Sequence, residues 1–191
     1  VDLGGSLLAH RDGFPGKLRP VNRLDRGTSG AVIMAKSPTA AGMFGRFVKE
    51  EGLDKVYLAV AQGRLPGEGI IDRPLDGKEA VTAFRLLFQG SAGALAAVYP
   101  LTGRMHQIRQ HFRLAGHPIL GDRRYGGSPL PGYEGFLLHS FRTTLTHPAT
   151  GDALTVSAPL PAGFLAHIRK LAGEFYPSVL RELPEIPAVT I

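Results

Sequence analysis

Apolar stretches of strand length recur along the chain. Ala31–Ala35 and Val56–Ala61 are nearly continuous apolar runs, which predicts two strands, the first of them buried. Four later segments alternate in polarity or are rich in β-branched and aromatic residues. They predict further strands at Thr82–Phe88, Leu95–Tyr99, Phe136–Leu145 and Leu154–Ser157.

Three segments are predicted to form helices. Ser37 is of a type that caps helices, and a helix is predicted over Pro38–Glu50 because proline is favoured at the first helical position. In Arg104–Ala115 apolar residues recur at helical spacing, and Gly116 follows, as is typical of a helix C-terminus. Pro161–Ala172 is the last predicted helix.

The remaining segments are rich in glycine and proline. Residues 1–20 are predicted to be loop with at most one short strand near Leu7–Ala9, Gly126–Gly135 is predicted to be loop, and the tail from Pro177 to be loosely packed. Strands outnumber helices, and their spacing is of hairpin length. We therefore expect an α+β fold, a mixed, largely antiparallel sheet with flanking helices, in one domain over residues 1–191.

Composition limits the class of protein. Hydrophobic residues make up 43% and charged residues 20% of the chain, which is typical of a globular protein with a core. No apolar run reaches the roughly 18 residues of a membrane span, and no signal-peptide pattern opens the chain. The absence of cysteine excludes disulfides, thiolate chemistry and Cys-based zinc sites. We expect a cytoplasmic protein.

The charge balance favours a polyanionic partner. The formal net charge is +6, and 16 of the 22 basic residues are arginine. Arginine binds phosphate in a bidentate manner and stacks on bases, so nucleic acid is a candidate partner. A basic soluble enzyme without such a partner is the alternative that charge alone leaves open.

The stretch "RPVNRLDRGTSGAVIMAK" places one carboxylate, Asp25, between Arg23 and Arg26 and ahead of a Thr-Ser-Gly turn. A structural ion pair with either arginine is one interpretation. Catalysis is the other, because neighbouring guanidinium groups favour the ionised form that a nucleophile or base needs. The hydroxyls of Thr28 and Ser29 are expected to fix the carboxylate by short hydrogen bonds.

Two further segments carry candidate chemistry. The polar side of Arg104–Ala115 offers guanidinium and imidazole groups, with a solvated basic helix face as the alternative. Its histidines, His106 and His111, are five residues apart rather than the four that align two metal ligands on a helix, so no metal site is predicted. Tyr57 is either a core aromatic or, facing a cleft, a platform for base stacking worth about 1–3 kcal/mol.

Four ordered blocks give the chain a family resemblance. They are "NRLDRGTSG" (Asn22–Gly30), "KVYLAVAQG" (Lys55–Gly63), "TGRMHQIRQH" (Thr102–His111) and "LHSFRTTLTHPATG" (Leu138–Gly151). In this order they resemble the pseudouridine synthases of the ribosomal large-subunit synthase A type, a group that includes the tRNA pseudouridine synthase C enzymes. Four blocks in register are far more specific than any single one.

The resemblance implies a cofactor-free, metal-free and monomeric isomerase that converts uridine in rRNA or tRNA into pseudouridine. It implies that Asp25 is the catalytic aspartate, that Tyr57 stacks on the base and that Arg109 pairs with the catalytic carboxylate. Arg23 is expected to fill the space left by the flipped base. The other residues expected to bind RNA are Arg26, Arg104, His106 and Gln107.

The chemistry of these residues agrees with the resemblance. The reaction breaks the bond at the anomeric carbon, turns the uracil and rejoins it through carbon 5. One ionised carboxylate is enough, either for covalent attack or for removal of a proton from the neighbouring sugar carbon, and both routes stay open. Glycoside hydrolysis uses two carboxyl groups about 5–10 Å apart. The other acids considered are interpreted as turn residues only: Asp72, Asp76 and Asp122.

The target uridine is stacked in RNA, so it must be flipped out, and looped or single-stranded sites make this least costly. Two alternatives to the isomerase are also consistent with the sequence. One is a catalytically idle RNA-binding or chaperone-like protein on the same fold. The other is a glycosidase that would release free uracil.

The chain departs from the family pattern in three ways. Asn22 stands where the family usually has histidine, which we expect to alter loop geometry more than chemistry. We expect the chain to start just after the D-K-P strand of the family. We also expect no separate N-terminal RNA-binding domain, which favours a compact RNA element such as a tRNA stem-loop.

Overall fold

The computed structural model describes residues 17–50, 52–147 and 149–183. The strand expected near Leu7–Ala9 lies outside these residues. In chain order the elements are β1 (Arg19–Pro20), β2 (Ser29–Gly30), β3 (Met34–Ala35), α2 (Pro38–Glu50), β4 (Asp54–Gln62), β5 (Glu68–Asp72), β6 (Val81–Gln89), β7 (Gly93–Pro100), α3 (Gln107–Leu114), η1 (Arg123–Tyr125), β8 (Leu138–Thr146), β9 (Ala153–Ser157), α4 (Ala162–Ala172), η2 (Gly173–Phe175) and α5 (Tyr176–Glu182).

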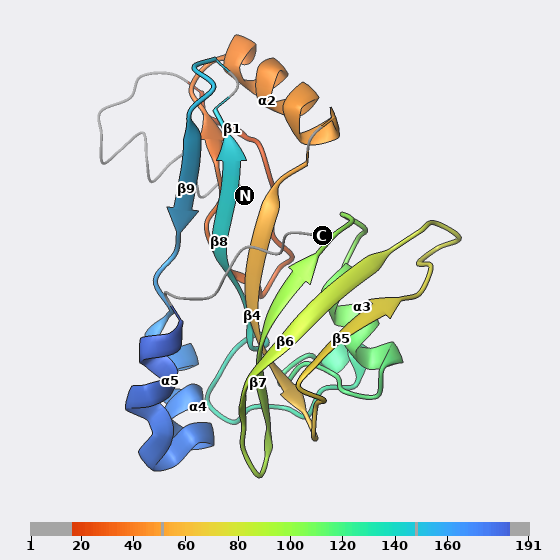
Figure 1. Ribbon diagram of the computed structural model, residues 1–191, viewed down its shortest axis with the longest axis vertical. Helices are drawn as coiled ribbons and strands as arrows, with labels where there is room; N and C mark the ends of the chain where they lie inside the picture. Colours follow the sequence, from red (N-terminus) through yellow and green to blue (C-terminus); the bar gives the residue numbers. More distant parts are fainter. Residues whose placement is uncertain (1–16, 51, 148, 184–191) are drawn as a thin grey trace.

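One seven-stranded sheet forms the centre of the described fold. Its strand order is β2-β8-β4-β7-β6-β5, and β9 pairs with β8 as well. Among these pairs β2 and β8 are parallel, whereas the others are antiparallel. Strands β1 and β3 form a separate antiparallel pair, beside which α2 lies at the top of Figure 1. The predicted α+β class with a mixed, largely antiparallel sheet is confirmed.

Each face of the sheet has its own hydrophobic cluster. Because side chains alternate along a strand, β4 sends Leu58 to one face and Ala59 to the other. On the first face the helices α4 and α5 pack, with Phe164 among the fully buried side chains. On the other face α3 packs through Ile108 and Phe112. Figure 1 shows α4 and α5 on one side of the sheet and α3 on the other.

The tail beyond Pro177 is not loosely packed within the described residues, so that prediction was wrong. Residues Tyr176–Glu182 form α5, and Val179 and Leu183 are buried in the first cluster. Pro177 occupies the first turn of the helix, where a missing N–H costs nothing. Pro177 led to the prediction of a loosely packed tail, although apolar residues recur at helical spacing after it.

The apolar run Ala31–Ala35 does not form one buried strand, which corrects a second prediction. The chain leaves the main sheet after β2 and joins the small sheet at β3, and within the run only Ala35 is buried. Strand β5 was not predicted. It is a short edge strand whose Ile70 is 70% exposed, so it carries little of the apolar pattern by which strands are detected.

The predicted helices agree with the structure more closely. Helix α2 has the predicted bounds, and the Ala40 N–H donates to the Ser37 hydroxyl at 3.0 Å. The third predicted helix, α4, starts one residue late. Helix α3 begins at Gln107 rather than at Arg104, because His106 adopts a left-handed backbone with φ of 53°.

Gly30 explains how β2 lies so close to β8. Its φ is +131°, and a Cβ atom there would lie 2.4 Å from the carbonyl oxygen of Ser140. Any other residue would push β2 away from its partner strand. The glycine that ends the first sequence block therefore allows the parallel pairing that positions the preceding loop.

Candidate active site

The sheet order brings the separated sequence blocks together. Gly30 of β2 is opposite Ser140 of β8, and Ser140 is opposite Tyr57 of β4. Tyr57 is in turn opposite Val98 of β7, which leads into α3. The loop before β2, the middle of β4 and the start of α3 therefore meet at one place.

Asn22 closes the loop that carries Asp25. Its side-chain oxygen accepts a hydrogen bond from the Ile33 N–H at 2.7 Å, and its amide group donates to the Ala31 carbonyl at 3.4 Å. At the tip of the loop the Thr28 N–H donates to the Asp25 carbonyl at 2.9 Å. Asn22 therefore fixes the geometry of this loop through its hydrogen bonds to the backbone.

The hydroxyls of the Thr-Ser-Gly turn do not hold the Asp25 carboxylate, contrary to expectation. The Ser29 hydroxyl lies 2.8 Å from Nδ1 of His139, whose Nε2 lies 3.1 Å from the Ala158 carbonyl. The Thr28 hydroxyl is buried without a partner among the described residues. The turn instead anchors β2 to β8 through the contact of Ser29 with His139. Burial at this place lowers the pKa of the His139 imidazole.

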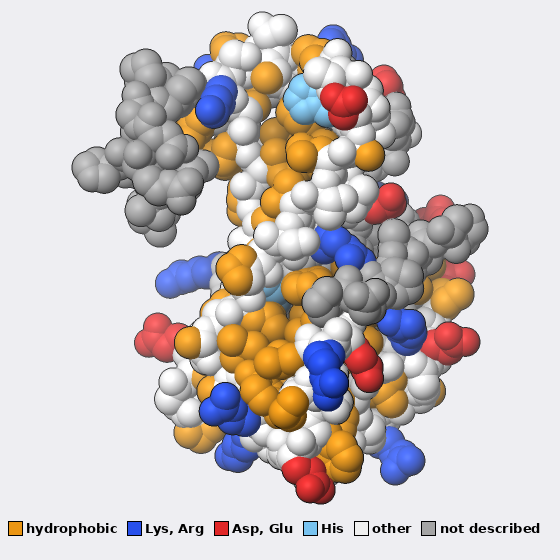
Figure 2. Space-filling model, turned by 60° about the vertical axis from the view of Figure 1, so that its left-hand side comes forward, with side chains coloured by type: hydrophobic (Ala, Val, Ile, Leu, Met, Phe, Trp, Pro, Cys, Tyr) orange, Lys and Arg blue, Asp and Glu red, His pale blue; other side chains and the backbone are white. Residues whose placement is uncertain are grey.

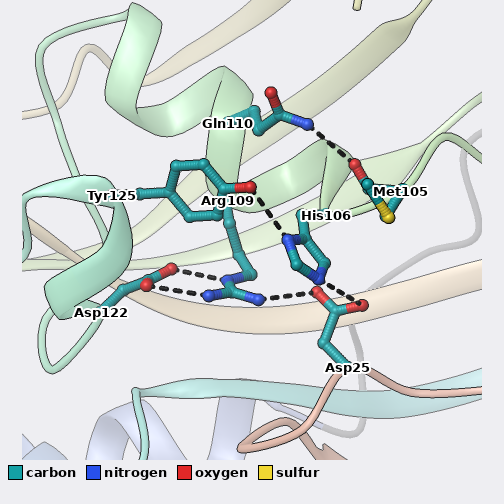
Figure 3. A network of polar contacts seen from close by, with 7 residues as sticks. All are labelled: Asp25, Met105, His106, Arg109, Gln110, Asp122 and Tyr125. Carbon is teal, nitrogen blue, oxygen red and sulfur yellow. Dashed lines mark hydrogen bonds and ion pairs between the residues drawn. The ribbon is translucent and has the colours of Figure 1, made fainter.

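Arg109 connects two carboxylates (Figure 3). Its Nε and one terminal nitrogen donate to Asp122 at 2.6 and 3.0 Å, and its other terminal nitrogen donates to Asp25 at 3.2 Å. The guanidinium also stacks on the Tyr125 and Phe136 rings, at 4.9 and 4.3 Å from their centroids. Asp25 is thus paired with an arginine 84 residues away in sequence, whereas its sequence neighbours Arg23 and Arg26 are exposed.

His106 lies near the other oxygen of the Asp25 carboxylate. Its left-handed backbone directs the imidazole between the Tyr125 hydroxyl, 2.9 Å from Nδ1, and the Asp25 carboxylate, 3.9 Å from Nε2 (Figure 3). Burial lowers the pKa of His106, and the Asp25 charge opposes that shift. A neutral imidazole can exchange hydrogen bonds with either neighbour.

Tyr57 presents an aromatic ring to the same region. It is partly buried on β4, on the face of Ala59 and Ala61. Burial raises the pKa of the phenol, and the charge of Asp25 adds to this shift. The phenol is therefore neutral near pH 7, which suits a stacking surface better than a base.

Gln107 is fixed within the protein. Its side-chain oxygen accepts from the Thr102 hydroxyl at 2.6 Å and from the Arg104 N–H at 3.0 Å. Its amide nitrogen donates to the Val81 carbonyl and to the Thr82 hydroxyl, at 2.9 and 3.0 Å. With both polar ends engaged, Gln107 supports the turn before α3.

His111 continues this support. Its Nδ1 lies 2.9 Å from the Thr82 hydroxyl and its Nε2 lies 2.9 Å from the Arg73 carbonyl, a pattern that fits a neutral imidazole. Burial lowers the pKa of His111. The buried network of Gln107, Thr82 and His111 ties α3 to β6.

A pocket of about 190 Å³ collects most of the predicted site residues. Arg23 and Arg104 are exposed there, and Asp25 is 28% exposed. The predicted residues that line it are Arg23, Asp25, Tyr57, Arg104, His106, Gln107 and Arg109.

Arg26 faces a different space. It lines a second pocket of about 690 Å³ that shares Arg109 with the first and includes the exposed residues Arg123 and Arg124. In Figure 2, by contrast, Lys and Arg side chains are dispersed among acidic ones on the face shown. Exposed arginines stand at both pockets, Arg23 and Arg104 at the first and Arg26, Arg123 and Arg124 at the second.

Sequence reasoning missed two important positions. Asp122 was interpreted as a turn residue, but it is 1% exposed and binds Arg109 with both oxygens. Lys55 lines the 190 Å³ pocket, although no role was predicted for it. The segment "GDRRYGG" after the third block was the available signal for Asp122, and the position of Lys55 two residues before Tyr57 was the signal for the lysine.

The described residues were also searched for a metal-binding group and for a membrane-spanning helix. They contain no group of three or more His, Asp or Glu side chains that could hold a metal ion. No helix in the described ranges is both long and apolar enough to cross a membrane.

Comparisons with known proteins agree with the sequence blocks. The family described as RNA pseudouridylate synthase matches residues 7–114. Ribosomal large subunit pseudouridine synthase C of Escherichia coli (strain K12) is 32% identical over 179 residues, covering 81% of this chain and 56% of that protein. Ribosomal large subunit pseudouridine synthase D of Nitrosomonas europaea is 32% identical over 185 residues, covering 85% and 54%. The chain spans about half the length of the curated relatives it matches.

Two solved structures have a similar fold. Human RNA Pseudouridylate Synthase Domain Containing 1 has a TM-score of 0.69 at 29% identity, covering 81% of this chain and 72% of that one. Human RNA Pseudouridylate Synthase Domain Containing 4 has a TM-score of 0.74 at 24% identity, covering 89% and 82%, and supports the fold alone.

Proposed function

The chain belongs to the RNA pseudouridylate synthase family, and from this premise we propose that it isomerises uridine in RNA to pseudouridine with Asp25 as the catalytic group. One observation carries the proposal. Asp25 is the one carboxylate among the described residues that line the 190 Å³ pocket, and Arg109 orients it there at 3.2 Å. A single oriented carboxylate beside an aromatic ring is what this isomerisation needs.

The proposed reaction is balanced within the nucleotide. The bond between N1 of uracil and the anomeric carbon breaks, a bond from carbon 5 to the anomeric carbon forms, carbon 5 loses its hydrogen and N1 gains one. Asp25 starts the reaction by attacking the anomeric carbon or by removing a proton from the adjacent sugar carbon. Arg109 keeps the carboxylate aimed in either case.

Tyr57 and Ile108 hold the detached uracil in this proposal. Tyr57 supplies the stacking face, and the apolar side chain of Ile108 lines the same pocket. A base that has lost its glycosidic bond must rotate without leaving, and an aromatic and apolar surface permits rotation within its plane. No cofactor is needed for these steps.

RNA enters past the exposed arginines. Arg23 and Arg104 stand at the pocket and are available for the displaced strand and its phosphates, with Arg23 filling the gap left by the flipped base. His106 is placed to contact the nucleotide beside Asp25. Gln107 contributes indirectly, by fixing the turn that carries Arg104. Arg26 reaches flanking RNA from the second pocket.

The names of the matching relatives guide the choice of the RNA to test. Because those relatives are named for the ribosomal large subunit, rRNA is the first substrate to test and tRNA is the second. We propose that the chain acts in the cytoplasm, as one domain and as a monomer.

The test uses RNA carrying tritium on carbon 5 of uridine. The wild-type protein should release tritium to water, and Asp25→Asn should lower the rate by about four orders of magnitude, the scale for removing a group that reacts. Asp152→Asn, at an exposed turn between β8 and β9, is the matched control and should release tritium at the wild-type rate.

Binding of the same RNA identifies the reason for a negative result. Full tritium release by Asp25→Asn would overturn the role of the aspartate. RNA binding that weakens with salt, without any tritium release by the wild type from rRNA or tRNA, would favour the binding-only alternative.

A further inference from the structure

Lys55 shares the candidate active-site pocket with Asp25. It lies two residues before Tyr57 on β4, so both side chains point to the same face of the strand, and both line the 190 Å³ pocket. The side chain is partly buried, and burial lowers the pKa of its ammonium group. Lys55 is therefore part of the site and not of the outer surface.

This ammonium group has no counter-ion in the described part of the chain. No carboxylate among the described residues lies within ion-pair distance of it, and no hydrogen bond of the side chain is found there. Asp25, the acid of the same pocket, is paired with Arg109 instead. The pocket lining includes Val48 and Leu53, whose side chains offer no acceptor. It also includes Asn22 and Gln107, whose side-chain oxygens accept hydrogen bonds from other groups of the protein.

An unpaired, partly buried charge destabilises the free protein, because part of its hydration is lost and nothing replaces it. A methionine of similar length would fill the same space without that cost. The cost is recovered only when an anion enters the pocket. Lys55 therefore prepares the pocket for an anionic ligand at the expense of stability.

On the basis of the function proposed above, which brings RNA into this pocket, we propose that Lys55 binds a backbone phosphate next to the flipped-out uridine. A uracil carbonyl could accept a hydrogen bond but carries no net charge, whereas a phosphate supplies the missing counter-ion. Lysine binds phosphate as a point charge. The contact would fix the nucleotide from the side of β4, while Arg109 and Asp25 approach from α3 and the loop before β2.

The experiment measures stability and binding on the same variants. Lys55→Met should raise the urea midpoint of unfolding with an unchanged m-value. It should weaken binding of a fluorescent single-stranded RNA heptamer with one central uridine about tenfold, and lower the slope of log K against log salt by about 0.7. Lys170→Met, at an exposed position of helix α4, is the matched control and should change neither quantity.

Neutral methylphosphonate linkages identify the partner. Replacing one of the two phosphates that flank the uridine should weaken binding to the wild type about tenfold, and should not weaken binding to Lys55→Met further. Lys55→Arg, which keeps the charge, should retain most of the affinity. The proposal is overturned if Lys55→Met is less stable than the wild type. It is also overturned if Lys55→Met reduces the affinity by the same factor for the unmodified RNA and for both RNAs with one neutral linkage. These readouts require no isomerisation, so they remain informative if tritium release fails.

Discussion

Arg109 holds two carboxylates in two different ways. Asp122 is 1% exposed and receives two hydrogen bonds, at 2.6 and 3.0 Å. Asp25 is 28% exposed and receives one, at 3.2 Å. The same cation therefore has a buried partner that fixes it and a pocket partner that it orients. The contrast separates the group that builds the site from the group that is available to a substrate.

The surroundings of Arg109 reinforce this division. The Tyr125 and Phe136 rings stack against the guanidinium, and Asp122 binds it in a bidentate arrangement, so its plane is fixed on the buried side. The one remaining terminal nitrogen is left to aim at Asp25. An enzyme gains from such preorganisation because the carboxylate needs no reorientation when the nucleotide arrives.

The largest expected effect comes from breaking the buried half of this arrangement. Asp122→Asn leaves Arg109 buried without a full counter-charge, which should lower the free energy of unfolding by about 3–5 kcal/mol. Asp25→Asn removes a single contact at a partly open position and should lower it by less than about 1 kcal/mol. Urea unfolding of the two variants measures the difference, and equal losses would contradict the division of roles.

The second prediction tests the pocket half alone. Asn22→Ala removes two hydrogen bonds that close the Asp25 loop, and should cost about 1–3 kcal/mol of stability. It should also lower the rate of tritium release, while the contact of Arg109 with Asp122 stays intact. Asn22→His, the residue usual in the family, should keep more activity than Asn22→Ala. Equal rates for Asn22→Ala and the wild type would show that the loop holds its shape without this side chain.

The smallest effect concerns two histidines away from the pocket. Burial lowers the pKa of His111 and of His139 below the ordinary value of 6.5. As pH falls below 6.5 the unfolded chain therefore takes up protons before the folded one, and stability decreases. Above about pH 7 these two groups contribute no slope.

Urea unfolding as a function of pH measures this effect. The decrease should amount to at most about 1.4 kcal/mol per pH unit for each histidine. His111→Gln should reduce the slope between pH 6.5 and 5, whatever its effect on absolute stability. A slope that stays the same in this variant would exclude His111 as a source.

The sequence predicted the residues of the pocket better than their partners. Asp25, Tyr57 and Arg109 lie in family blocks, and the structure brings them to one pocket. Asp122 was missed because a Gly-Asp pair is usually a turn, and burial of a carboxylate depends on a distant arginine that no local pattern reveals. The support of the Asp25 loop by Asn22, and not by the turn hydroxyls, is likewise a tertiary fact.

The wrong predictions of secondary structure have the same origin, because they too depend on contacts that a local pattern does not reveal. Ala31–Ala35 is apolar enough for a strand, but the chain there passes from one sheet to another. Helix α5 was hidden by Pro177, although its apolar spacing was present. Local propensity predicted β4, β6, β7 and α2 well, because each of these is a long element with a regular pattern.

The parallel pairing of β2 with β8 has a consequence for how the chain acquires its site. Ser29 and His139 are 110 residues apart, and contacts of such separation form late, since the intervening chain must be closed first. During synthesis β4, β6, β7 and α3 are complete before β8 leaves the ribosome. Until β8 arrives, the loop of Asp25 has no strand against which to lie. The last central strand to be made, β8, therefore completes the support of the loop that carries Asp25.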